Sequence, residues 1–409
     1  MEKKKERLFN IYFFIIIFVN LTVSAMMQMF NSTIALHMNE LDYGASVSGT
    51  IISIGAISAS IYRFFGGKLC ERSGRKKLIM AGIGCFGIMS VLLGSTSNMP
   101  LIYIFRIFQM FGYSMASTAV SIAVIDVIPK SRVGEGLGYY SLATFLPQAC
   151  GPSIALFLFQ MKGGFFSVMA GAGAIGAISL AITCLFLNYE KRMREQTPDM
   201  EMPLQNNKIS SEQGVWKYIE KRALPASVIN FFIMFVGTLV TMYLTLYATQ
   251  SGIANPGLFF TFSAIAMVAA RIVSGKLYDS IGVLAAVVPG ILMLMGGFIL
   301  LVFCSRIPWG YYAAGILYGL GTGMSEPALN AQAVRGVRKE RTSIATSTFF
   351  LPVDIAFMAG SVLWGMMIDH LSFSFIFSIA ALVSGIALMF SLVVFALQRP
   401  QNAGRTLEI

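Results

Sequence analysis

Residues 66–77 read GGKLCERSGRKK, a short basic stretch with three glycines that separates two long apolar segments. A related stretch, GKLYDSIG, occupies residues 275–282 in the same kind of surroundings. We interpret both as charged turns at which one apolar segment ends and the next begins. A turn of this kind that occurs twice predicts a chain built from two similar halves.

The composition is that of a protein embedded in lipid. The chain has 409 residues, of which 56% are hydrophobic and only 12% charged, and its mean hydropathy is +0.72. Soluble domains carry about 25% charged residues, and a single aqueous core could not bury this much apolar surface. The apolar segments are long and lack the short alternation of barrel strands, so we predict an all-α integral membrane protein.

The apolar segments number twelve, and each is about as long as the twenty residues that cross a bilayer core. They cover residues 10–36, 46–68, 78–97, 100–124, 137–160, 165–188, 223–249, 257–277, 284–304, 309–332, 342–368 and 372–397.

These spans divide the chain into two pseudo-symmetric bundles of six helices. Residues 1–188 form the N-terminal half and residues 223–398 the C-terminal half. Residues 189–222 are polar and contain two prolines, which predicts a flexible linker. Residues 399–409 form a short tail.

The basic residues predict how the bundle is oriented. Twenty-five Lys and Arg residues lie in the termini and loops of one side, against two, Lys162 and Arg306, on the other. By the positive-inside rule, both termini, the linker and the tail are cytoplasmic, in a multi-pass protein of the plasma membrane. This placement also accounts for the net charge of +11, so we expect no nucleic-acid partner.

Other classes of site have little support in the residues. The five cysteines lie in or beside apolar segments without any CxxC pair, and there are two histidines, so we expect neither disulfides nor a metal site. No HExxH or GxSxG pattern occurs, so we expect no enzyme. A membrane enzyme or a sensor remains the alternative from another class.

The two halves align at three places in chain order. Residues 63–74 match 271–282 with a shift of 208 positions, and residues 106–115 match 315–324 with a shift of 209. Leu-Pro at residues 146–147 matches Leu-Pro at 351–352 with a shift of 205. Two parallel halves of this kind are typical of transporters, with a substrate site near the bilayer midplane between them.

The first basic stretch resembles the signature loop between helices 2 and 3 of the major facilitator superfamily, which usually has Asp where this chain has Glu71. The residues that carry the resemblance are Gly67, Leu69, Glu71, Arg72, Gly74, Arg75 and Lys76.

Two further motifs resemble the twelve-helix drug:proton antiporter branch of that superfamily. Arg106, Gln109 and Gly112 have the spacing of its buried-arginine motif. Gly151 and Pro152 stand where the branch has its antiporter motif. That motif is incomplete, because Pro147 replaces its first glycine and Ala155-Leu156 its final glycine pair.

The resemblance implies a cytoplasmic gate built from the first stretch. Its members would be Gly67, Glu71, Arg72, Gly74, Arg75 and Asp126, with Asp126 as a further partner at the end of the fourth span. The alternative is that the basic run only sets the topology.

Charges inside the spans are candidates for proton coupling. Arg106 lies about 9 Å into the fourth span, where a charge should face protein or water, unless its side chain reaches back to the interface. The first span has no carboxylate, so the embedded acids are Asp354 and Glu326. We expect Asp354, near mid-membrane, to lead in proton coupling or cation binding, with Glu326 second. Either acid could instead be a polar contact between helices.

Polar residues within the spans could line a substrate path, namely Asn31, Gln148, Asn230, Tyr243 and Asn330.

We therefore predict a monomeric secondary active transporter that exports small amphipathic compounds by alternating access. It would take its energy from the proton gradient and need no cofactor; its partners would be the small-molecule substrate and the lipid bilayer. The alternatives are export of one anionic metabolite, such as an opine-type metallophore that Arg106 and Arg271 could bind, or import.

Overall fold

The structure is a computed structural model that describes residues 9–129, 133–186, 219–304, 309–337 and 342–397. Within helices, the side chains of residues 64–68 and 71–72 and of several residues near the starts of the fifth and eleventh spans are outside that description. The chain divides into two compact units, Met1–Met202 and Pro203–Ile409. This boundary falls inside the predicted linker 189–222, most of which lies outside the described residues.

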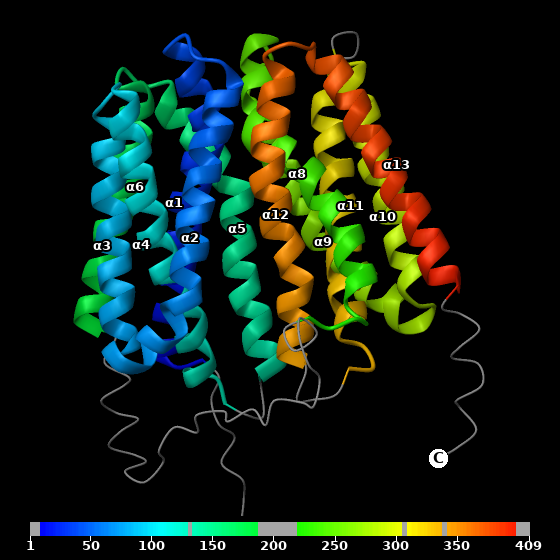
Figure 1. Cartoon of the computed structure of the whole chain (residues 1–409), viewed down its shortest axis with the longest axis horizontal. Coiled ribbons are helices and arrows are strands. Elements are labelled where there is room, and N and C mark those ends of the chain that lie inside the picture. The colour runs from blue at the N-terminus through cyan, green and yellow to red at the C-terminus, as the bar shows by residue number, and fades with distance from the viewer. Residues whose placement is uncertain (1–8, 130–132, 187–218, 305–308, 338–341, 398–409) are drawn as a thin grey trace, which may run out of the picture. The chain divides into compact units, whose positions relative to one another are not determined.

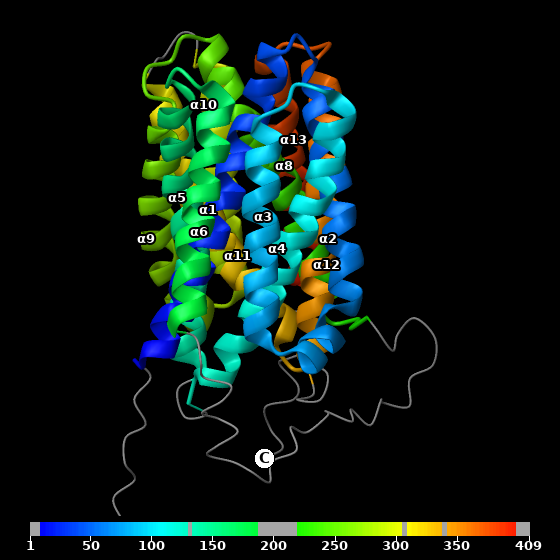
Figure 2. The same cartoon turned by 90° about the vertical axis from the view of Figure 1, so that its left-hand side faces the viewer.

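The described part of unit 1 contains six helices, which lie side by side in Figures 1 and 2. They are α1 (Ile11–Glu40), α2 (Ala45–Ser73), α3 (Arg75–Gly94), α4 (Met99–Val127), α5 (Val133–Phe159) and α6 (Gly164–Phe186).

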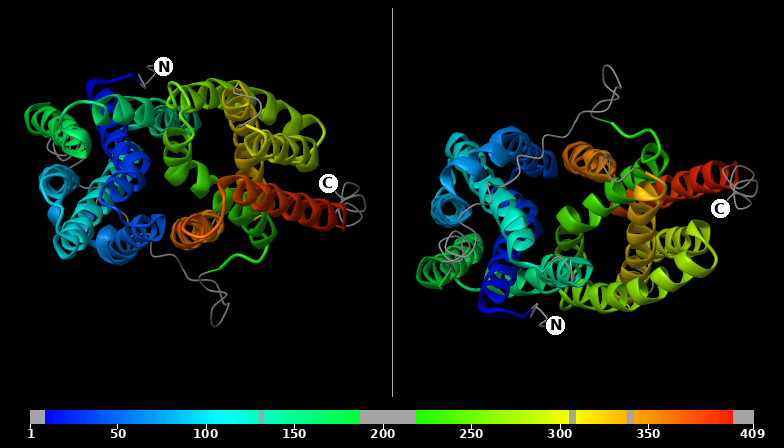
Figure 3. Two further views of the ribbon diagram at one scale, coloured as in Figure 1. Left: turned by 90° about the horizontal axis from the view of Figure 1, so that it is seen from above. Right: turned by 90° about the horizontal axis from the view of Figure 1, so that it is seen from below.

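Unit 2 repeats this arrangement, and Figure 3 views the helices of each unit end-on. Its helices are α8 (Leu224–Gln250), α9 (Leu258–Ser280), α10 (Val283–Val302), α11 (Gly310–Val334), α12 (Thr342–Ile368) and α13 (Phe373–Leu397).

The observed helices confirm the predicted all-α fold with two six-helix bundles. Within the described ranges each predicted span corresponds to one helix, and ten of the helices are long and apolar enough to cross a membrane by length and composition. The other two are α5 and α11. Helix α11 carries many glycines together with Glu326, which lowers its mean hydropathy.

The basic stretch that opened the sequence is mostly helix, which corrects its interpretation as a turn. Helix α2 continues to Ser73, and only Gly74 leaves the helix, with φ 82°. In unit 2, α9 likewise continues to Ser280, and Gly282 has φ 113°. These positive φ values are readily adopted by glycine alone, so one glycine suffices to reverse the chain and the charged residues before it stay helical.

The internal repeat extends to the packing of the helices. In unit 1, helix α4 packs on α2 and α3, helix α6 packs on α3, and helix α1 packs on α5 and α6. In unit 2, helix α11 packs on α9 and α10, helix α13 packs on α10, and helix α8 packs on α12 and α13. Each pair in unit 1 therefore has its counterpart in unit 2.

Two helix crossings show the repeat at atomic distance. A Cβ atom at Gly112 of α4 would lie 2.8 Å from the carbonyl oxygen of Gly82 of α3. A Cβ atom at Gly321 of α11 would lie 2.7 Å from the carbonyl oxygen of Gly290 of α10. The shifts between these glycine pairs are 209 and 208 positions, as in the sequence alignment. Small residues at such crossings let the two backbones approach closely.

Candidate functional site

Arg106 is completely buried in α4 within unit 1. Its Nη1 donates a hydrogen bond to Gln109 Oε1 at 2.6 Å, and Gln109 Nε2 donates to Ser90 Oγ of α3 at 2.8 Å. The guanidinium lies 3.8 Å from the ring centre of Phe30 of α1, a cation–π contact. Full burial rules out the alternative in which this side chain reaches the membrane interface.

The buried guanidinium is incompletely satisfied. Among the described residues, neither Nε nor Nη2 of Arg106 has a hydrogen-bond partner, and no carboxylate forms an ion pair with it. A buried charge in this condition is costly unless an anion or water reaches it. Arg106 is thus the strongest candidate in unit 1 for an anionic contact.

Gly55 of α2 provides the space that Arg106 occupies. A Cβ atom at Gly55 would lie 2.8 Å from Arg106 Nε and 2.7 Å from Met110 Cγ. In unit 2 the small residue lies on the other helix of this crossing. Gly55 corresponds to Ser263 of α9, and Met110 corresponds to Gly319 of α11. A Cβ atom at Gly319 would meet the Ser263 carbonyl oxygen. Our sequence reasoning missed Gly55, although the same alignment could have identified it.

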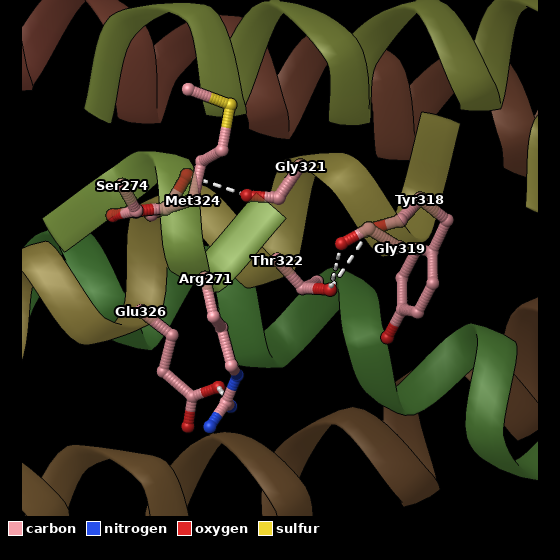
Figure 4. Close-up of polar contacts among 9 residues, drawn as sticks. Arg271, Ser274, Tyr318, Gly319, Gly321, Thr322, Met324 and Glu326 are labelled. Atoms are coloured by element: carbon pink, nitrogen blue, oxygen red, sulfur yellow. Dashed lines mark hydrogen bonds and ion pairs between the residues drawn. The ribbon is translucent and has the colours of Figure 1, made fainter. Parts of the chain in front are cut away.

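Unit 2 contains an ion pair between two spanning helices. Arg271 Nη2 of α9 lies 3.4 Å from Glu326 Oε2 of α11, and both side chains are about one-fifth exposed (23% and 22%). Figure 4 shows the two side chains reaching toward each other. Both residues stand roughly 12–14 Å from the ends of their helices at Ser280 and Val334, by helical rise. The sequence suggested each residue separately but not the pair.

Close packing of α9 on α11 fixes the position of this pair. Gly315, Gly319 and Gly323 recur every fourth residue along α11 and face the backbone of α9; for example, a Cβ atom at Gly323 would lie 2.7 Å from the Met267 carbonyl oxygen. Ser274 Oγ of α9 also donates to the Met324 carbonyl oxygen at 2.7 Å (Figure 4). The close packing of the two helices brings Arg271 and Glu326 within contact distance.

Asp354 differs from its expected setting. Its side chain is exposed on α12, beside exposed Leu351 and Ile355. Helical rise predicts how far along α12 Asp354 lies, but not which face of the helix it is on. That face is not covered by other helices of unit 2. The leading role expected of Asp354 therefore stays a prediction.

The predicted gate contains one described ion pair. Arg75 Nε at the start of α3 lies 3.1 Å from Asp126 Oδ2 near the end of α4, with side chains that are 10% and 19% exposed. Gly74 forms the junction between α2 and α3. The side chains of Glu71 and Arg72, and the space at Gly67, lie outside the described residues. The contact that the structure describes between Asp126 and the motif is the one with Arg75.

The antiporter-type motif of α5 packs against α1. A Cβ atom at Gly151 would lie 3.0 Å from Gln28 Cβ, and Pro152 is buried. One helical turn or more away, Asn20 Nδ2 of α1 donates to Thr144 Oγ1 of α5 at 2.8 Å. The motif therefore sits in a close contact between two helices of unit 1.

The five polar candidates for a substrate path divide into three groups. Asn31 Oδ1 and both side-chain polar atoms of Asn230 are buried without a hydrogen-bond partner in the described part of the chain. Tyr243 is buried and donates to the Ser361 carbonyl oxygen, which is a structural contact. Gln148 and Asn330 are half-buried. Asn31 and Asn230 thus retain the hydrogen-bonding capacity that a ligand could use.

The described residues contain no group of three or more His, Cys, Asp or Glu side chains that could hold a metal ion. None of the five cysteines, all of which the structure describes, forms a disulfide.

Comparisons with known proteins agree with this architecture. A Staphylococcus aureus protein named Staphylopine export protein is 23% identical over 379 residues, covering 91% of this chain and 93% of its own. Multidrug resistance protein 2 of Bacillus subtilis is 24% identical over 378 residues, covering 86% and 87% of the two chains. A crystal structure of a D-xylose-proton symporter superposes with a TM-score of 0.73 at 14% identity, covering 92% of this chain and 96% of that one.

A family profile completes the assignment. The profile described as Major Facilitator Superfamily matches residues 14–354, which is most of the chain and includes parts of both units. The repeat of six helices, the motif before α3 and these relatives lead to one conclusion: the chain belongs to the major facilitator superfamily and is a multi-pass membrane transporter.

Proposed function

We propose that this transporter exports small compounds in exchange for protons, and that Glu326 is the proton-exchanging residue. The observation that carries this proposal is the Arg271–Glu326 pair, in which a guanidinium and a carboxylate are in contact between two tightly packed spanning helices. Protonation of Glu326 would remove the negative charge that Arg271 contacts between the two helices, which weakens the attraction that holds the pair. Binding of a proton would therefore favour a second arrangement of the helices.

The direction of transport is supported by the relatives. The S. aureus protein is named for export and the B. subtilis protein for multidrug resistance. The distribution of basic residues supports a cytoplasmic location for both termini, at the plasma membrane, and we propose a monomer because each chain already holds two complete bundles. The proton gradient would supply the energy, without a cofactor.

The acid assignment can be tested in inverted membrane vesicles, with uptake of a cationic dye driven by an imposed proton gradient. We expect Glu326→Gln to abolish gradient-driven uptake while the protein stays folded. Asp354→Asn is the matched control and should retain uptake. If Asp354→Asn abolishes uptake and Glu326→Gln does not, the assignment of Glu326 is wrong.

A second candidate is export of one anionic metabolite, such as the opine-type metallophore considered above. Two observations favour it: Arg106 has two nitrogen atoms without a partner, and the S. aureus relative is named for staphylopine export. In the same vesicles, anionic compounds but not cationic dyes should then compete for transport. Arg106→Gln should remove that competition, whereas equal competition by both classes would exclude this candidate.

The gate remains part of the proposal. We infer that the Arg75–Asp126 pair braces the junction of α2 and α3, so that Glu71 and Arg72 can act there during opening and closing.

A further inference from the structure

A cavity of about 610 Å³ opens at one end of unit 2, where α9 ends, α10 begins and α11 ends. Its wall is formed by Tyr278, Asp279, Ser280, Ile281, Gly282, Ala331 and Arg335. A Cβ atom at Gly282 would meet nothing within 4 Å, so the chain reversal itself leaves space. A volume of this size is typical of sites for small molecules.

The internal repeat shows how the charges at this end of unit 2 differ from those in unit 1. Arg75 is the first residue of α3 and reaches across to Asp126 of α4. The counterpart of Arg75 is Val283, the first residue of α10, whose side chain is too short to cross to α11. The counterpart of Asp126 is Arg335, which follows α11. Unit 2 thus lacks the crossing cation and carries the opposite charge at its far end.

Two charged side chains of opposite sign line the cavity. Asp279 and Arg335 are both exposed, and neither forms an ion pair with any residue that the structure describes. The Arg335 guanidinium lies 5.9 Å from the ring centre of Tyr278, whose hydroxyl forms a hydrogen bond with Gln332 Oε1 at 3.1 Å. Tyr278 is thereby held as an aromatic part of the cavity wall beside Arg335.

We propose that this cavity is a binding site for a small zwitterionic compound. Its ammonium group would pair with Asp279, its carboxylate with Arg335, and its apolar part would pack on Tyr278. Charge complementarity favours this class, because a purely cationic or anionic ligand would bring a like charge close to one of the two residues. With the proposed orientation the site faces the cytoplasm, where it would report the level of such a compound to the exporter.

The test uses the purified full-length protein in detergent, without a membrane gradient, and measures binding calorimetrically. The probes are ε-aminocaproate, which is a zwitterion, its N-acetyl derivative, which is an anion, and its amide, which is a cation. The variants are Asp279→Asn and Arg335→Gln. Lys276→Gln is the matched control, since Lys276 is an exposed cation on α9 outside the cavity wall.

We expect the wild type to prefer the zwitterion to either derivative by about fivefold, which corresponds to one exposed ion pair. Asp279→Asn should remove the preference over the anion, and Arg335→Gln the preference over the cation, while Lys276→Gln keeps both. Equal binding or no binding of the three probes by the wild type would overturn the proposal, and so would a loss of preference in Lys276→Gln.

This outcome is separable from that of the proposed function. Glu326→Gln should lose gradient-driven transport but keep the binding preference, because Glu326 lies away from the cavity wall. If the protein shows no proton-driven uptake but prefers the zwitterion, the proposed function is wrong and the binding site stands. If it shows proton-driven uptake but no preference for the zwitterion, the binding site is wrong and the proposed function stands.

Discussion

Replacement of Gly55 by alanine tests whether Arg106 must occupy its observed position. The new Cβ atom would lie 2.8 Å from Arg106 Nε and 2.7 Å from Met110 Cγ. Ordinary contacts between such atoms are about 3.5–4.0 Å, so these side chains must move by about 0.8 Å. Overpacking of this kind costs about 1–3 kcal/mol, and the gain in helix propensity from Gly to Ala offsets up to about 1 kcal/mol.

The expected result is a folded protein with impaired transport. A net loss of about 0–3 kcal/mol leaves most of the structure intact, whereas the displaced guanidinium loses its 2.6 Å bond to Gln109. Initial rates in inverted vesicles and thermal unfolding in detergent measure the two effects. Gly84→Ala in α3 is the control, because a Cβ atom there meets nothing within 4 Å.

Two outcomes would refute this reasoning. One is transport by Gly55→Ala at the wild-type rate when Arg106→Gln is inactive. The other is full rescue of Gly55→Ala by Met110→Ala, since the methionine and not the arginine would then be the group that has to move.

Three further changes have effects that follow from single contacts. Asp126→Asn should weaken the pair with Arg75 and lower unfolding stability by about 2 kcal/mol; in a double-mutant cycle with Arg75→Gln, fully additive effects would contradict the pairing. Tyr243→Phe should cost about 1 kcal/mol, because it removes the hydrogen bond that the Tyr243 hydroxyl donates to the Ser361 carbonyl oxygen of α12; an unchanged unfolding temperature would argue against this bond. Gly319→Ala should cost about 3 kcal/mol or more by forcing α11 away from α9. Its control is Gly275→Ala, which should be neutral or stabilising because the added Cβ atom meets nothing within 4 Å. Similar unfolding temperatures for the two variants would disprove the close approach of α11 to α9.

The sequence was sufficient for the helices but not for how they face one another. Runs of apolar residues determine where a span starts and stops, so the predicted boundaries agree with the structure to within several residues. The exception is residues 66–73, where charge suggested a turn and the structure has helix up to Gly74. One glycine with a positive φ is enough to end a helix. Hydropathy does not indicate which glycine takes this role.

Pairing of side chains was the less predictable part of the site. Arg271 and Glu326 are 55 positions apart on different helices, and their contact depends on the rotation of both helices. Asp354 shows the same limit, because helical rise predicts a depth along α12 but not the exposed face on which the side chain lies. Arg106 was predictable as a buried charge because its motif and depth agreed, whereas Gly55 required a comparison of the two halves.

The glycine crossings of α3 with α4 and of α10 with α11 have a practical consequence for studies of motion. Backbones that touch at Gly82 and Gly112, or at Gly290 and Gly321, cannot slide without separating, so each helix pair should move as one rigid body. Spin labels placed on the two helices of one pair should keep a constant distance in every state. Such a pair offers an internal reference, in the same molecule, against which changes elsewhere in the transporter can be measured.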